Sequence, residues 1–183
     1  MRCIVLIEEI IDKCYDNIVE SYSNTAILLN AVDVAIKRYS NESNIIALST
    51  TANIPSDFLV NPSKERIYSV EDLVDAYKFD VIKKLAEDFL ISTISKTDIM
   101  FEDIYRELLI KDGVPTEEIT RKLISPWRTL TDYFRTLELE EPFVDSFHDS
   151  FEIYLIWRQF RHALLHSGGV LKEKNYSSIR ISE

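Results

Sequence analysis

The chain contains only three glycines, Gly113, Gly168 and Gly169, among its 183 residues, and this scarcity constrains the fold more than any other feature. Sandwiches and barrels of many short strands need frequent glycine-containing turns, so these architectures are disfavoured. Apolar residues make up 46% of the chain, which is enough to bury a core in a protein of this length. The composition therefore favours long helices joined by few turns.

Apolar side chains recur at steps of three and four along most of the chain, which is the spacing of a helix that buries one face. The expected helices cover residues 2–22, 25–39, 69–93, 97–112, 115–125, 126–137 and 142–166. Ser69 is typical of a helix N-cap, and Ser167-Gly168-Gly169 is typical of a helix stop. The sequence predicts an all-α fold, a bundle of about six or seven helices with little or no sheet.

Residues 45–68 are the least regular stretch. Pro55 and Pro62 stand there among scattered Ser, Thr and Asn, which favours an ordered non-helical segment holding a short strand or helical turn. We expect one all-α domain over residues 1–183. Within it we distinguish an N-terminal extension at 1–68, a helical core at 69–171 and a polar tail at 172–183.

The formal net charge is −10, so the molecule as a whole should repel nucleic acids and anionic membranes. The charge is uneven, because residues 156–183 carry five basic and two acidic side chains. An acidic protein with a basic C-terminal end is the first functional indication.

Cys3 and Cys14 are the two cysteines, and on one helix they would lie roughly 16 Å apart, too far for a disulfide. This pattern favours a reducing compartment. The apolar start is followed at once by Glu8 and Glu9 rather than by a cleavage site, and no apolar run is long enough to span a membrane. We therefore expect a cytoplasmic protein that does not insert into membranes.

The three glycines do not form a phosphate-binding loop, and the chain has no paired-cysteine or His-Glu-x-x-His motif for zinc. Asp145 and His148 have the spacing of a metal-ligand pair, but a di-iron bundle needs two such elements and further carboxylates. We expect neither a metal nor a cofactor.

The most informative segment is the end of the last expected helix. Helical geometry places Arg158, Arg161, His162 and His166 within an arc of about 140°. The residues of the opposite arc, which we expect to face the core, are Ile153, Ile156, Phe160, Ala163 and Leu164. Because Phe151, Tyr154, Leu155 and Leu165 share the basic arc, that arc suits a surface that packs against a partner and leaves a polar pocket. The two tryptophans, Trp127 and Trp157, are expected in the core or at its edge.

The basic arc carries residue types that can cleave RNA. Histidine, with an ordinary pKa of about 6.5, transfers protons near neutral pH. The arginine guanidinium binds phosphate at two points and stabilises charge that develops on a phosphoryl group. RNA supplies its own nucleophile, the 2′-hydroxyl, so a histidine and an arginine can cut RNA without a metal but cannot cut DNA in this way.

Arg161, four further residues and then His166, with His162 directly after the arginine, resemble the Arg-x(4–6)-His signature of HEPN domains. The Ser-Gly-Gly-Val at 167–170 is similar to the small-residue turn that follows the motif histidine in several HEPN branches. The resemblance implies an all-α, usually dimeric protein. Many members of the family are metal-independent endoribonucleases of toxin–antitoxin or antiviral defence systems, with a composite site where the motif helices of two protomers meet.

By this resemblance Arg161 and His166 would be the catalytic pair, with His162 at the supporting polar position. The implied partners are an RNA substrate, a second copy of the chain bound through the C-terminal motif helix, and an antitoxin or effector protein. Arg158 stands where many members carry an acid, and together with Lys172 in the tail it would bind RNA phosphate.

Each of these residues also has a structural interpretation. His166 would suit the C-terminal end of a helix dipole, and Arg158 would pair with a carboxylate one turn away. Arg161 would pair with Glu141 or Asp145 of a second protomer. The corresponding alternatives for the protein are a catalytically inactive HEPN-fold module that binds RNA or protein, and a small helical regulatory subunit. If Arg161 and His166 are catalytic, replacing either by alanine should lower stability by no more than ~1 kcal/mol.

Overall fold

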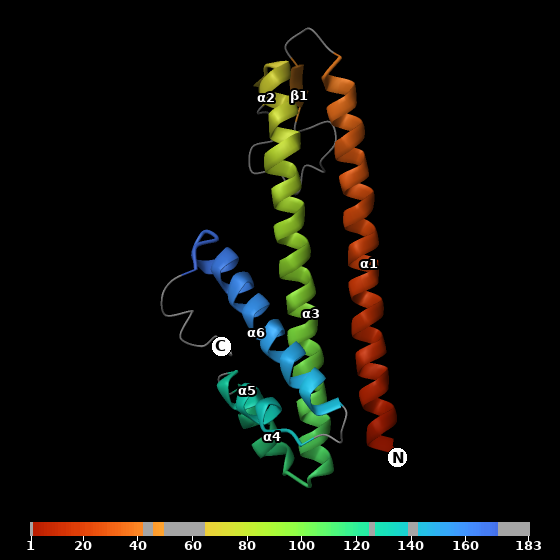
Figure 1. The fold of residues 1–183 in the computed structure, drawn as a ribbon, viewed down its shortest axis with the longest axis vertical. Coiled ribbons are helices and arrows are strands. Elements are labelled where there is room, and N and C mark those ends of the chain that lie inside the picture. Colours follow the sequence, from red (N-terminus) through yellow and green to blue (C-terminus); the bar gives the residue numbers. More distant parts are fainter. Residues whose placement is uncertain (1, 42–45, 50–64, 125–126, 139–142, 172–183) are drawn as a thin grey trace. The chain divides into compact units, whose positions relative to one another are not determined.

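The computed structural model describes residues 2–41, 46–49, 65–124, 127–138 and 143–171 (Figure 1). The elements of this part are α1 (Arg2–Tyr39), β1 (Ile46–Ser49), β2 (Glu65–Tyr68), α2 (Val70–Asp75), the π-helical segment η2 (Ala76–Val81), α3 (Ile82–Lys111), α4 (Thr116–Ile124), α5 (Arg128–Arg135) and α6 (Phe143–His166). Because α2, η2 and α3 follow one another without a break, the described part contains five separate helices. The all-α prediction is confirmed, with slightly fewer helices than expected.

Two expected helix breaks are absent. α1 continues through residues 23–24, and α3 continues through 93–98. In α3, hydroxyls at the expected break bond back to the preceding turn: Ser95 Oγ donates to the Ile91 carbonyl at 2.6 Å, and Thr97 Oγ1 to the Thr93 carbonyl at 3.0 Å. Such back-bonding lets polar residues remain inside a helix, so the polar cluster marked no boundary.

The expected helix ends at glycine are confirmed. Gly113 follows α3 with φ of 76°, and Gly168 and Gly169 follow α6 with φ of 60° and 80°. At the end of α3 the Val114 N–H donates to the Leu109 carbonyl at 3.0 Å, the six-to-one bond of a Schellman motif around Gly113, and at the end of α6 the Gly169 N–H donates to the Ala163 carbonyl at 3.0 Å. Ser69 caps α2 as predicted, since its hydroxyl accepts from the Asp72 N–H at 3.0 Å. The predicted helix starts at Pro126 and Pro142 lie outside the described residues.

The chain divides into two compact units, one of residues 22–88 and one of residues 1–21 with 89–183. In the unit 22–88, β1 and β2 pair antiparallel, with Ile46 opposite Tyr68. These strands lie at the two ends of the irregular stretch in which a short strand was expected. Tyr39 and Tyr77 stack in the same unit, with ring centroids 5.8 Å apart. The expected subdivision after residue 68 falls inside this unit.

The core of the other unit lies between the second part of α3 and the helices α4, α5 and α6 (Figure 1). Its centre is aromatic. Phe134 of α5 and Phe151 of α6 are both 2% exposed, and the Phe101 ring of α3 lies 5.0 and 5.1 Å from their centroids in edge-on contacts. This packing fixes α6 against α3 and thereby positions the C-terminal basic residues. None of the described helices has the length and apolar character needed to cross a membrane.

Candidate functional site

α6 packs largely with the face that carries the basic residues rather than with the predicted apolar arc. Phe151, Tyr154 and Leu155 are buried, although the helical wheel grouped them with the basic arc. Ile153 and Phe160, which were expected to face the core, are 55% and 38% exposed. The arc expected to face the core is apolar and the arc that carries the basic residues is mixed, so periodicity identified the two faces but predicted the wrong one as buried. The aromatic side chains at 151 and 154 decide it, because they complete the Phe101–Phe134 cluster.

The two tryptophans divide accordingly. Trp127, at the start of α5, is half-buried at the edge of the core, as predicted. Trp157 of α6 is 46% exposed, so its predicted core position is wrong. Its ring lies 5.6 Å from that of Phe160, and with Ile153 these residues form an exposed apolar stripe on α6. Ala163, from the same predicted arc, is buried as expected.

The burial of the opposite face brings both motif-region arginines onto a single carboxylate of α3, that of Asp98. Arg158 Nε donates to Asp98 Oδ1 at 3.1 Å, and Arg161 Nη1 donates to Asp98 Oδ2 at 3.3 Å. Arg161 Nε also donates to the hydroxyl of Ser95 at 3.0 Å. The side chain of Asp98 is only 12% exposed, and those of the arginines are 25% and 26% exposed. One carboxylate thus faces two guanidinium groups.

Tyr154 is the third side chain that contacts Asp98. Its hydroxyl donates to Asp98 Oδ1, so Asp98 accepts from three side chains of α6 at positions 154, 158 and 161. These positions lie on one helical face. Burial and the neighbouring Asp98 carboxylate raise the pKa of Tyr154, so it remains a neutral donor throughout the physiological range.

Arg158 has a second partner. Its guanidinium carbon lies 3.7 Å from the centroid of the Trp127 ring, a cation–π contact, and Trp127 Nε1 in turn donates to Glu102 Oε1 at 2.9 Å. Arg158 is therefore held between α3 and the start of α5. The expectation that it pairs with a carboxylate one turn away is wrong, because the carboxylate belongs to α3.

The two motif histidines lie together at the end of α6. The rings of His162 and His166 have centroids 4.8 Å apart, and both side chains are exposed. Arg161 lies one residue before His162, but its pairing with Asp98 and Ser95 turns it toward α3. Between Arg161 and His166 the helix advances about 7.5 Å and turns about 140°. The structure therefore brings together the two arginines and, separately, the two histidines; Lys172 lies outside the described residues.

Asp98, Ser95 and Tyr154 were not predicted from the sequence as members of this site. A signal for Asp98 exists in the sequence, because it lies on the same face of α3 as Ile94, Phe101 and Tyr105, all of which are buried. A carboxylate on an apolar helical face must be paired when it is buried. The signal did not identify the partners, since they lie some sixty positions away, at 154, 158 and 161.

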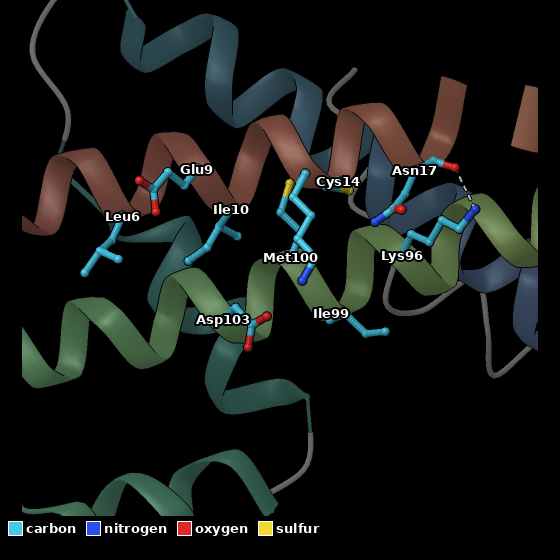
Figure 2. A pocket seen from close by; sticks show the side chains of 10 residues that line it. Leu6, Glu9, Ile10, Cys14, Asn17, Lys96, Ile99, Met100 and Asp103 are labelled. Atoms are coloured by element: carbon cyan, nitrogen blue, oxygen red, sulfur yellow. Dashed lines mark hydrogen bonds between the residues drawn. The ribbon is translucent and has the colours of Figure 1, made fainter. Parts of the chain in front are cut away.

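A separate cavity of about 280 Å³ lies between the first part of α1 and α3 (Figure 2). Its lining is mainly apolar, with Leu6, Ile10 and Met100 among the residues, and none of the predicted site residues lines it. At one end the Lys96 ammonium donates to the Asn17 carbonyl at 2.7 Å and to the Ser21 hydroxyl, so this lysine ties α3 to α1. The cavity is also lined by Cys14, and burial raises the pKa of its thiol.

In the described ranges, no three His, Cys, Asp or Glu side chains are grouped so that they could hold a metal ion. Comparisons with protein-family models, with curated proteins and with solved structures find no match to this chain.

Proposed function

We propose that the chain is a metal-independent endoribonuclease of the HEPN type that acts in a toxin–antitoxin or antiviral defence system. The observation that carries this proposal is the pair of exposed imidazoles at the end of α6, those of His162 and His166, on the helix that also carries Arg161. A guanidinium has five N–H groups. Two of those of Arg161 are used by Asp98 and Ser95, and three others remain for a phosphate.

The chemistry follows from these groups. His166 accepts the proton of an RNA 2′-hydroxyl, whose oxygen attacks the adjacent phosphorus and forms a new P–O bond. The bond to the 5′-oxygen breaks, and that oxygen takes a proton from a second imidazole, so the products are a 2′,3′-cyclic phosphate and a 5′-hydroxyl. Arg161 holds the phosphate and stabilises its developing charge. His162 supports the proton transfer.

A second copy of the chain is part of the proposal. Arg161 and His166 diverge by about 140° around α6, so a phosphate contacts both types of side chain more readily where the helices of two copies meet. Leu165 is 46% exposed between them and would be covered in such a dimer. The exposed stripe of Ile153, Trp157 and Phe160 is on another face of α6, which leaves it for an antitoxin or effector protein. We place this system in the cytoplasm.

The deciding experiment incubates purified protein with mixed tRNA and with single-stranded RNA in excess EDTA, and identifies the product ends. Wild-type protein should leave 2′,3′-cyclic phosphates, and His166→Ala should be inactive. His148→Gln is the matched control, because it changes the remaining histidine of the same helix outside the cluster. Activity that persists in His166→Ala, or that disappears equally in the control, would contradict the assignment.

An inactive RNA-binding or protein-binding module is the second candidate. It is favoured by the separation of the two arginines, which face Asp98 of α3, from the two histidines, which lie exposed at the end of α6. Fluorescence anisotropy with labelled RNA distinguishes the two, since a module binds RNA equally well with and without His166 and never cleaves it.

A further inference from the structure

Asp98 is the most heavily bonded side chain among the contacts of this site, and no sequence motif includes it. It accepts hydrogen bonds from Tyr154, Arg158 and Arg161, which reach it from three successive turns of α6. Only 12% of its side chain is exposed, so these contacts are largely shielded from water. Through these contacts Asp98 links α3 to α6 and orients both arginines.

The contacts of Arg161 fix the orientation of its planar guanidinium group, not only its position. Its Nε bonds to the hydroxyl of Ser95 and its Nη1 to Asp98, so two atoms of one rigid guanidinium are anchored to two residues of α3. A free arginine side chain samples many rotamers, and ordering it at the moment of reaction would cost entropy. Here that ordering is complete before a substrate arrives, and the unused N–H edge has a fixed direction.

We infer that Asp98 is the positioning residue of the proposed ribonuclease site and that it acts through Arg161, an inference that rests on the proposed function. Asp98 does not itself contact RNA, since its carboxylate would repel a phosphate. Its pairing with two guanidiniums leaves the cluster one positive charge in excess. The Asp98 carboxylate thus orients the guanidinium of Arg161, which binds the phosphate. Its negative charge also weakens the attraction of the cluster for RNA.

Asp98→Asn tests the inference, because it keeps the shape of the side chain and removes its charge. One oxygen becomes an NH₂ group, which cannot accept from a guanidinium, and the negative charge is removed, so the contact with Arg161 is weakened. We expect kcat to fall by about 10- to 100-fold from misorientation of Arg161. We expect KM to fall as well, because the site gains one unit of positive charge. A merely structural effect would lower the active fraction and leave KM unchanged, which would overturn the inference.

A second readout needs no RNA. The Nη1–H of Arg161, which donates to Asp98, should give a ¹⁵N-correlated NMR signal that is protected from solvent exchange in the wild type and is assigned by its absence in Arg161→Lys. Asp98→Asn should remove that protection. Asp103→Asn is the matched control, since Asp103 lies on the same helix in an exposed pair with Arg106 at 2.5 Å.

The two measurements separate the possible failures. An Arg161 signal that is unprotected in the wild type, or equally protected in Asp98→Asn, would overturn the positioning role even if RNA is cleaved. Absence of cleavage by the wild type would overturn the proposed function, and the NMR comparison would then decide alone whether Asp98 holds Arg161. In an Arg161→Ala background, Asp98→Asn should lower kcat no further, because the group through which it acts is gone.

Discussion

Replacing Arg161 should cost more stability than replacing His166, contrary to the expectation from sequence that both cost little. Arg161 is three-quarters buried and donates to Asp98 and Ser95, whereas His166 is exposed at the end of α6. A hydrogen bond to a charged group contributes about 1.5–3 kcal/mol, and partial exposure reduces this through solvent screening. Asp98 keeps Arg158 and Tyr154, so no charge is left unpaired. We expect Arg161→Ala to cost about 1–2 kcal/mol and His166→Ala less than about 0.5 kcal/mol.

Urea unfolding followed by circular dichroism at 222 nm measures this difference. With a slope of about 2 kcal/mol per molar urea, a cost of 1–2 kcal/mol moves the midpoint down by about 0.5–1 M. The control is Asp98→Ala, which leaves two buried guanidiniums without their carboxylate and should cost about 3–5 kcal/mol. In that background Arg161→Ala should cost almost nothing further. Equal midpoints for Arg161→Ala and His166→Ala would show that the contact with Asp98 does not form in solution.

Three further predictions concern the aromatic core, the glycine turn after α6 and the buried hydroxyl of Tyr154. Phe134→Ala should cost about 3–5 kcal/mol in the same urea assay, whereas alanine at Phe79, which is 66% exposed, should leave the midpoint unchanged. Gly169→Ala should cost about 1–2 kcal/mol because φ is 80° there, and a midpoint equal to that of the wild type would show that the turn has another conformation. The raised pKa of Tyr154 means that the unfolded chain loses this proton near pH 10 while the folded chain keeps it, so stability should fall above that pH. Tyr154→Phe should make that decline less steep, and an unchanged decline would contradict the assignment.

The sequence was sufficient wherever a feature depends on residues close together in the chain. The glycine at 113 and the pair at 168–169 predicted the ends of α3 and α6, and Ser69 predicted the start of α2. These are effects of local backbone conformation. The predicted break near residue 95 failed for a related reason, because Ser and Thr can bond to the preceding turn as well as end a helix.

The sequence was insufficient where two faces of one helix compete for the core. On α6 the arc with Ile153 and Phe160 is the more apolar, yet the arc with Phe151 and Leu155, which also carries the basic residues, is the one that packs on the core, so periodicity predicted the wrong face. The choice depends on the aromatic rings that α3 and α5 offer, which belong to residues distant in sequence. The HEPN resemblance concerned Arg161, His162 and His166 and a dimeric site, and it carried no information about Asp98 or Ser95.

The contacts of Asp98 bear on the choice between an enzyme and a binding module. A module selected for RNA affinity would gain from leaving both guanidiniums unpaired, since each phosphate contact adds attraction that is lost when a carboxylate competes for the arginine. A cleavage site gains instead from a phosphate-binding group whose direction is fixed before the charge develops. One buried carboxylate paired with two arginines reduces the affinity for RNA and fixes the orientation of the guanidinium groups. Binding that is equal in ground and transition states does not accelerate cleavage, whereas orientation toward the developing charge does. This is the physical reason to rank the ribonuclease above the module.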